Sequence, residues 1–261
     1  MNDYRLRLLY SGSTGNAALL EAGDAAILID AGKSARTLTA ALTEAGCPPE
    51  RLSAVFLTHE HSDHTSALAV FLKRYPLPVH TTERCAAALL ACRGSASIAP
   101  HLVIHPPLFS TQIGPFSISS FETPHDSQSS VGYRVRICRE GRVHEIGYAT
   151  DIGQVTESVL TGFCGCEAAV VECNHDEAML MTGPYPEDLK RRIASARGHL
   201  SNADCAALAA KLAAAGTKRL LLAHLSETNN TPELALAAVR TALGACGVTV
   251  RAAAPDCMTE L

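Results

Sequence analysis

The chain contains no tryptophan and few other aromatic residues. Aromatic side chains make up 5% of its 261 residues, whereas hydrophobic residues as a whole make up 47%. Low-complexity segments are absent too, and this composition argues against an intrinsically disordered protein. The alanine- and leucine-rich apolar content suits an α/β protein. From the length we expect one domain that spans residues 1–261.

Long hydrophobic runs are also missing. No stretch stays apolar over the roughly 20 residues that a membrane-spanning helix needs. Residues 1–7 lack the apolar core of a secretory signal peptide. We therefore expect no membrane association and a cytoplasmic location.

Paired cysteines are not indicated, although the chain has ten cysteines. Cys85, Cys92, Cys205 and Cys246 lie in alanine-rich stretches with helical patterns, where a free cysteine behaves as a small buried hydrophobe. The C-x-C motif that begins at Cys164 has no second pair at zinc-finger spacing. The cysteines therefore indicate neither the disulfide framework of a secreted protein nor a zinc finger.

Basic residues are not in excess. Lysine and arginine number 22 against 26 aspartate and glutamate, which gives a formal net charge of −4 at pH 7. Proteins that coat nucleic acid nonspecifically usually carry a basic surface, so this charge argues against that class. It does not exclude a nuclease. Short basic groups such as residues 190–192 suit a phosphate track and a solvated face equally well.

Short apolar runs alternate with helical patterns along the chain. Strands are predicted at residues 4–10, 17–21, 25–30, 54–57, 78–80, 116–121, 131–138, 143–149, 168–173, 219–223 and 248–251. Helices are predicted at residues 34–45, 65–74, 82–91, 185–196, 201–215 and 231–244. The two β-rich halves, each flanked by helices, predict two packed sheets with helices outside.

Three histidines and an aspartate fall within six residues, directly after the predicted strand at 54–57. They are His59, His61, Asp63 and His64, in the pattern H-x-H-x-D-H. Imidazole and carboxylate groups bind zinc, manganese or iron, and alternate residues of an extended loop can direct His59 and His61 at one ion. Asp63 and His64 then fall where a second ion could lie. The cluster predicts a metal site, against the alternative of a chance group of surface histidines.

Four more polar residues lie at or next to the ends of predicted strands. His125 precedes one strand, whereas Asp151 and His224 each follow one. Together with the histidine cluster, these three could complete two metal sites and provide a carboxylate that bridges both ions. Asp30 ends another strand. It either orients a metal-bound histidine or organises the turn, and the sequence leaves both roles open.

These residues, in this order, resemble the metallo-β-lactamase fold of dinuclear metallohydrolases. The resemblance implies a four-layer αββα sandwich of two mixed β-sheets with helices on the outer faces. It implies that a first divalent metal ion is held by His59, His61 and His125. It implies that a second is held by Asp63, His64 and His224, and that Asp151 bridges the two. The ligand types leave zinc, manganese and iron open.

Finer motifs resemble one branch of this family, the YycJ-type (WalJ-type) exonucleases. They include S-G-S-T-G-N at residues 11–16, E-C-N-H-D at 172–176, G-H-L-S-N at 198–202 and H-L-S at 224–226. The resemblance implies a phosphodiesterase that degrades DNA from 5′ to 3′. One departure is Cys173, where the family pattern suggests a small residue such as alanine. Its thiol either packs or alters the metal preference.

A dinuclear site predicts hydrolysis by a hydroxide held between two ions. Asp63 could orient this nucleophile or accept its proton. His199 is our candidate general acid, because G-H-L-S resembles the phosphate-side histidine motif of related RNA-processing nucleases; the alternative is a histidine that merely packs. Ser201, as a helix N-cap whose neighbouring amides face an anion, suits a scissile phosphate. Asn174 and His175 are weaker candidates for substrate contacts.

Other functions stay open at this point. The same scaffold could carry a tRNA 3′ processing enzyme, a cyclic phosphodiesterase, or a lactone or thioester hydrolase, since fold and metals alone do not determine the substrate. A binding module without catalysis is a third class, which the complete set of candidate ligands argues against. The motif at His199 favours phosphoesters over lactones.

Overall fold

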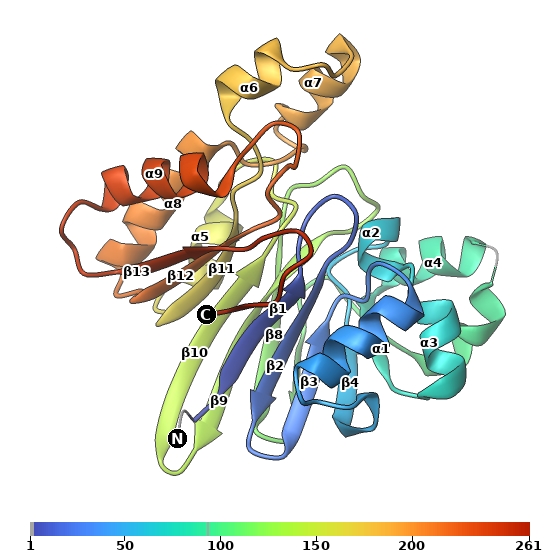
Figure 1. Cartoon of the computed structure of the whole chain (residues 1–261). Helices are drawn as coiled ribbons and strands as arrows, with labels where there is room; N and C mark the ends of the chain where they lie inside the picture. The colour runs from blue at the N-terminus through green and yellow to red at the C-terminus, as the bar shows by residue number, and fades with distance from the viewer. Residues whose placement is uncertain (1–2, 93) are drawn as a thin grey trace.

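The structure is a computed structural model that describes residues 3–92 and 94–261 (Figure 1). Met1, Asn2 and Arg93, which belong to the expected domain of residues 1–261, lie outside the described residues. The strands are β1 (Arg5–Tyr10), β2 (Ala17–Ala22), β3 (Ala25–Ile29), β4 (Leu52–Phe56), β5 (Val79–Thr82), β6 (Leu102–His105), β7 (Ser110–Ile113), β8 (Phe116–Glu122), β9 (Val131–Arg139), β10 (Arg142–Ala149), β11 (Ala168–Glu172), β12 (Arg219–Ala223), β13 (Thr249–Ala252) and β14 (Thr259–Glu260).

Helices separate many of these strands. The α-helices are α1 (Ala35–Glu44), α2 (Ser62–Thr65), α3 (Leu68–Arg74), α4 (Glu83–Ala91), α5 (Glu157–Phe163), α6 (Glu177–Thr182), α7 (Glu187–Ile193), α8 (Asn202–Ala214) and α9 (Pro232–Leu243). The 3-10 helices are η1 (Pro49–Arg51), η2 (Ser95–Ser97) and η3 (Ala99–His101). Within the described residues, no helix combines the length and the apolar character that crossing a bilayer requires.

The strands form two mixed sheets of seven strands each among the described residues. The first sheet has the order β14-β1-β2-β3-β4-β5-β6, and the second has the order β13-β12-β11-β10-β9-β8-β7. In each sheet an antiparallel part adjoins a parallel part, which begins at β3 in the first sheet and at β10 in the second. The prediction of two mixed sheets is confirmed.

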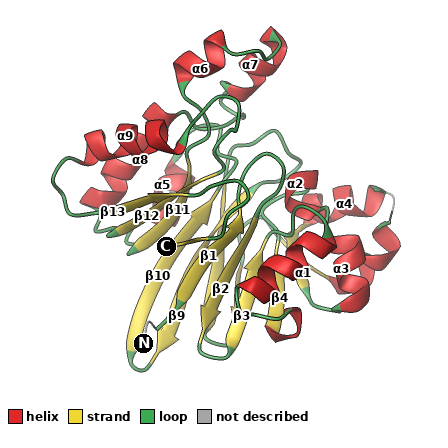
Figure 2. Ribbon diagram, in the orientation of Figure 1, coloured by secondary structure: helices red, strands yellow, loops and turns green. Residues whose placement is uncertain are grey.

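Three apolar cores hold four layers together. Between the sheets, Phe56 packs in one core with Tyr133 and Leu221. A second core joins the outer face of the first sheet to α1, α3 and α4, and a third joins the second sheet to α5, α8 and α9. Figure 2 shows the helices on the two outer sides of the strands. The predicted αββα sandwich is thereby confirmed.

Local sequence explains the regular elements. Strand β11 reads A-A-V-V-E and is buried along its whole length, as expected for a parallel strand covered on both faces. Strands β9 and β10 are joined by Glu140 and Gly141, whose φ angles of 51° and 76° are those of a tight two-residue hairpin turn. The Ser201 side chain caps α8 by accepting a hydrogen bond from the amide of Asp204.

Several boundaries differ from the predictions. The single helix expected at residues 65–74 is two helices, α2 and α3, because the helical turn already begins within the histidine cluster. The helix expected at residues 185–196 is the shorter α7, and α5 and α6 were not predicted. Strands β6, β7 and β14 were missed as well. All three are edge strands with half-exposed residues, so they lack the apolar pattern of an internal strand.

Candidate metal centre

The candidate residues meet where parallel strands of both sheets end. Strands β10, β11 and β12 pair in parallel, so Asp151, Glu172 and His224 leave the second sheet at one edge. In the first sheet, β3 and β4 are parallel and place Asp30 beside the loop that leads to His59. The carboxyl ends of parallel strands are where α/β proteins form ligand sites. The fold therefore brings distant segments of the chain to one place.

Three of these residues have a left-handed backbone. The φ angles of Asp30, Asp151 and His224 are 62°, 58° and 55°. This conformation costs a non-glycine residue about 1 kcal/mol or more, and such strain concentrates at functional sites. All three lie within two residues of the end of a strand. Their left-handed backbone therefore turns the chain, and with it the side chain, away from the direction of the strand.

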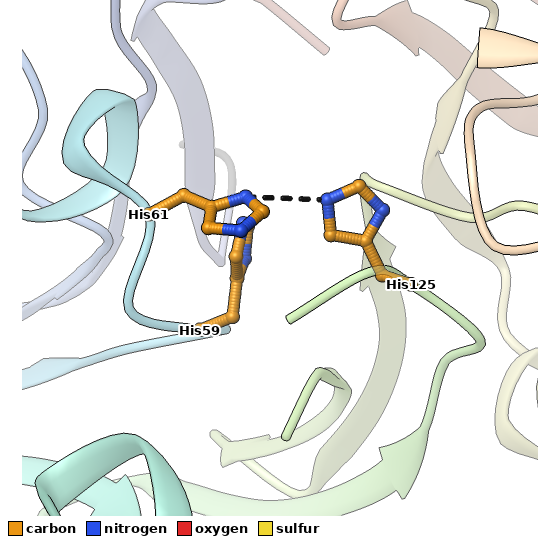
Figure 3. Close-up of side chains that lie close together, drawn as sticks. All are labelled: His59, His61 and His125. Atoms are coloured by element: carbon orange, nitrogen blue, oxygen red, sulfur yellow. Dashed lines mark hydrogen bonds between the residues drawn. The ribbon is translucent and has the colours of Figure 1, made fainter. Parts of the chain in front are cut away.

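His59, His61 and His125 form the first group of candidate ligands (Figure 3). One ring nitrogen from each lies within 4.8 Å of the others. The Nδ1 atom of His61 lies 3.3 Å from the Nε2 atom of His125. Two nitrogens that each bind a tetrahedral ion at about 2.0–2.1 Å are separated by about 3.3 Å. The three histidines therefore have the spacing of ligands to one metal ion.

Asp63, His64 and His224 form a second group with the same property. Asp63 Oδ2 lies 3.3 Å from His64 Nε2 and 3.6 Å from His224 Nε2. Asp151 lies between the two groups: its Oδ2 is 3.2 Å from His64 Nε2, and its Oδ1 is 3.6 Å from His125 Nε2. The structure thus brings together all seven residues that the sequence analysis named as ligands.

The chemistry of these donors fits a divalent metal. The Nε2 atoms of His59 and His224 are buried and make no hydrogen bond among the described residues. An unpaired buried polar atom costs about 1–3 kcal/mol, so two such atoms aligned in one cage indicate a missing partner. Imidazole and carboxylate donors are those that zinc, manganese and iron accept. We conclude that the cage suits divalent metal ions.

Asp30 and Thr58 orient His64 and His59 through contacts to their Nδ1 atoms. Asp30 Oδ2 accepts a hydrogen bond of 2.8 Å from His64 Nδ1, and Asp30 Oδ1 accepts one of 2.8 Å from the amide of Thr58. The hydroxyl of Thr58 lies 3.0 Å from His59 Nδ1. A hydrogen bond at Nδ1 sets the tautomer and leaves Nε2 for a metal. Of the two roles left open for Asp30, the geometry supports the orientation of His64.

Glu172 is a site residue to which the sequence analysis assigned no role. Its Oε1 accepts hydrogen bonds from His199 Nδ1 at 2.8 Å and from His224 Nδ1 at 2.9 Å. Its Oε2 accepts from the amides of Ile152 and Leu200. Burial opposes ionisation, but the two histidines outweigh it and lower the pKa of Glu172 to about 2. The sequence did contain a signal for this role: Glu172 is a carboxylate at the end of an otherwise apolar strand, and a buried charge needs partners.

His199 lies beside the cage and stays partly accessible. Its side chain is 21% exposed, and its Nδ1 lies 3.7 Å from Asp151 Oδ1. The hydrogen bond to Glu172 turns Nε2 away from the carboxylate, and His199 lines two cavities of about 200 Å³ and 260 Å³. The ring is therefore placed to reach a bound substrate, which argues against a histidine that merely packs.

The weaker candidates lie around these two cavities. Asn174 lines the smaller one, and His175 and Ser201 line the larger one. Two of the amides near Ser201, which were expected to face a phosphate, bind protein acceptors: the Asn202 amide donates to the His175 carbonyl at 2.8 Å, and the Asp204 amide donates to Ser201 Oγ at 3.1 Å. These two amides are already paired, and Ser201 acts as the helix cap expected from the sequence.

Cys173 is buried, and all ten cysteines are free. Its thiol donates to Asn202 Oδ1 at 3.0 Å. Among the described residues, none of the groups with metal-ligand spacing includes a cysteine. This geometry supports the packing role of Cys173.

Known proteins resemble this chain in sequence and in structure. A family model described as a β-lactamase superfamily domain matches residues 25–225. The chain is 34% identical over 228 residues to exodeoxyribonuclease YycJ of Bacillus anthracis, a match that covers 87% of this chain and 84% of that protein. It is 32% identical over 234 residues to exodeoxyribonuclease WalJ of Streptococcus pneumoniae, with 89% and 85% covered.

A solved structure shares the fold. The metallo-β-lactamase fold protein YhfI of Bacillus subtilis aligns with a TM-score of 0.71 at 19% sequence identity, over 99% of both chains. The family resemblance predicted from the H-x-H-x-D-H cluster is confirmed by the sequence relatives. The chain is therefore a member of the β-lactamase superfamily and, within it, of the YycJ-type branch of metal-dependent hydrolases.

Proposed function

We propose that this protein is a metal-dependent exonuclease that degrades DNA from 5′ to 3′ with a dinuclear metal centre. The observation that carries the proposal is the position of His199 beside the seven-residue cage, with its Nδ1 held by Glu172 and its ring open to two cavities. The names of the YycJ and WalJ relatives support DNA as the substrate. The proposal treats residues 1–261 as one domain, since both sheets contribute to the cage.

The ligand sets follow from the two groups described above. A first ion would be held by His59, His61 and His125, a second by Asp63, His64 and His224, with Asp151 shared between them. When bound, two zinc, manganese or iron ions would supply a shared hydroxide as nucleophile and stabilise charge on the attacking and leaving oxygens.

The chain itself supplies proton transfer and orientation. His199 would donate a proton from Nε2 to the leaving alkoxide of the phosphodiester, because an alkoxide leaves poorly without one. Glu172 keeps the other ring nitrogen protonated and so directs Nε2 toward the substrate. Asp63 would bind metal and orient the nucleophile, since its carboxylate is partly exposed between His64 and His224.

The test compares substrate classes on metal-reconstituted protein. Duplex DNA and single-stranded DNA, each labelled at the 5′ or the 3′ end, are incubated beside precursor tRNA and a lactone. We expect a 3′ label to give a descending ladder and a 5′ label to be released as a mononucleotide at once. His61→Ala should abolish the reaction, whereas His101→Ala, outside the cage, should not. Cleavage of tRNA or lactone with intact DNA would overturn the proposal.

A further inference from the structure

Two cavities share His199 as part of their walls. The first, about 200 Å³ in volume, includes Ser13, Tyr185 and Arg192, and we call it the arginine cavity. The second, about 260 Å³, is lined by His175, Glu177, Leu180, Met181, Ser201 and Asp204 among others, and we call it the acidic cavity. Residues 177–194, which include the projecting helices α6 and α7 of Figure 1, contribute to both.

The charge at the rim of the acidic cavity, away from His199, disfavours a phosphate. Among the described residues, no lysine or arginine lines it, and Glu177 and Asp204 lie at its exposed rim. Two amides in the first turn of α8 give no compensation, because Asn202 and Asp204 donate theirs to protein acceptors. The carboxylates of Glu177 and Asp204 would repel the negative charge of a phosphate bound beside them. At this rim an uncharged or cationic group therefore binds more favourably than an anion.

The His175 side chain, which lines the acidic cavity, lacks a hydrogen-bond partner in the described part of the chain. His175 is 3% exposed, its Nδ1 is buried without a partner, and neither ring nitrogen makes a hydrogen bond within residues 3–92 and 94–261. Buried polar side chains are nearly always paired, so His175 keeps unused hydrogen-bonding capacity beside the cavity that it lines. Leu180, which is 1% exposed, and Met181 add an apolar wall.

Glu177 and Asp204 differ in their freedom to bind a ligand. Asp204 accepts a hydrogen bond of 3.0 Å from the Ser201 hydroxyl. The carboxylate of Glu177, in the first turn of α6, makes neither a hydrogen bond nor an ion pair in the described part of the chain. Glu177 is therefore the free acceptor of this cavity.

We propose that the acidic cavity binds the base of the terminal nucleotide and that Glu177 selects bases with an exocyclic amino group. This inference rests on the proposed function, since it places the scissile phosphate at His199. The apolar wall suits a flat ring, His175 can pair with a ring nitrogen or carbonyl, and Glu177 can accept from an amino group. The volume is slightly below the roughly 300–1,000 Å³ of pockets for drug-sized ligands, which suits one base.

The first test measures hydrolysis of single-stranded oligonucleotides that are identical except for a 5′-terminal cytosine or uracil. These bases share one ring and nearly the same size; they differ at position 4, an amino group against a carbonyl oxygen, and at N3, an acceptor in cytosine and an N–H donor in uracil. We expect kcat/KM to favour cytosine on the order of tenfold, the value of one hydrogen bond to a charged group. Equal values for the two substrates would overturn the proposal.

Glu177→Gln tests the selecting residue directly. A glutamine amide can donate to the uracil carbonyl, so the preference should vanish or reverse. The matched control is Asp188→Asn. It removes an exposed carboxylate from α7, the helix that follows α6, at a residue that does not line the cavity. It should keep the wild-type preference. A preference that survives in Glu177→Gln, or one that is lost equally in both variants, contradicts the assignment.

A binding measurement separates this inference from the proposed function. Calorimetric titration of the metal-reconstituted protein with dCMP and dUMP needs no turnover. We expect dCMP to bind on the order of tenfold more tightly than dUMP, and Glu177→Gln to remove the difference. If no oligonucleotide is cut but this difference holds, the nuclease proposal fails and the base site stands. Equal affinities in the wild type overturn the base site, whatever the activity.

Discussion

Glu172 and His199 are joined by a hydrogen bond of 2.8 Å, although 27 positions separate them in the sequence. The same carboxylate oxygen accepts from His224 at 2.9 Å. One buried group therefore positions both the candidate general acid and a candidate metal ligand. This shared support predicts different outcomes for the loss of Glu172 and the loss of His199.

Replacing Glu172 with glutamine should weaken metal binding and activity together. Glutamine keeps the size but removes the charge that holds both histidines. Partners behind metal-bound histidines usually contribute about 10–100-fold to metal affinity or activity. Elemental analysis after dialysis and DNA cleavage measure the two effects. Glu167→Gln removes a carboxylate that bonds His144 outside the cage and should change neither quantity. Full metal content and activity in Glu172→Gln would refute the supporting role.

Replacing His199 with alanine should slow DNA cleavage by about 10²–10⁴-fold while the metal content stays unchanged. A p-nitrophenyl phosphodiester has a leaving group that needs no proton, so its hydrolysis should fall much less. Steady-state rates with both substrates make the comparison. Equal losses on the two substrates, or loss of metal, would eliminate the role as general acid.

His144 predicts a pH-dependent contribution to stability far from the metal centre. Partial burial lowers the pKa of His144, but hydrogen bonds to Asp3 at 3.0 Å and Glu167 at 2.9 Å outweigh it and raise the pKa overall. Because the pKa is higher in the folded state, protonated His144 stabilises the fold. This stabilisation is complete below the unfolded-state pKa of about 6.5 and is lost as the pH rises through the folded-state pKa. His144→Gln should therefore destabilise the protein more at pH 5.5 than at pH 9. Urea unfolding at the two pH values measures this, and an equal effect at both would contradict it.

The core between the sheets predicts a large stability effect at Leu221. This side chain is fully buried between the two sheets, so Leu221→Ala should cost about 2–5 kcal/mol of unfolding free energy. Leu234→Ala, at a position that is 40% exposed on α9, should cost less than about 1 kcal/mol. Urea unfolding at one fixed metal concentration compares them, because bound metal adds its own stabilisation. Similar costs would argue against the packing described here.

The candidate ligands could be singled out from the sequence because their signals are local. His59, His61, Asp63 and His64 form one dense motif, and Asp151 follows an apolar strand that any periodicity analysis detects. The two sheets followed from the same alternation of strands and helices. Edge strands such as β6 and β7 were missed because half-exposed strands carry no continuous apolar pattern.

The supporting residues could not be predicted because their roles depend on three-dimensional register. Glu172 matters because β11 and β12 pair in parallel with Glu172 opposite Ala223, which puts it beside His224. That pairing joins segments about 50 positions apart and is not encoded in either segment alone. The acidic cavity is similar, since Glu177 and Asp204 come from different helices.

The most direct test of the metal centre is anomalous diffraction from crystals of metal-reconstituted protein, recorded at the absorption edge of the added metal. The account predicts two peaks about 3.5–4 Å apart. One should lie among His59, His61 and His125, and the other should lie beside His64, with Asp151 between them. No peak in the cage, or a single peak that Asp151 does not touch, would contradict the dinuclear centre on which the proposed function depends.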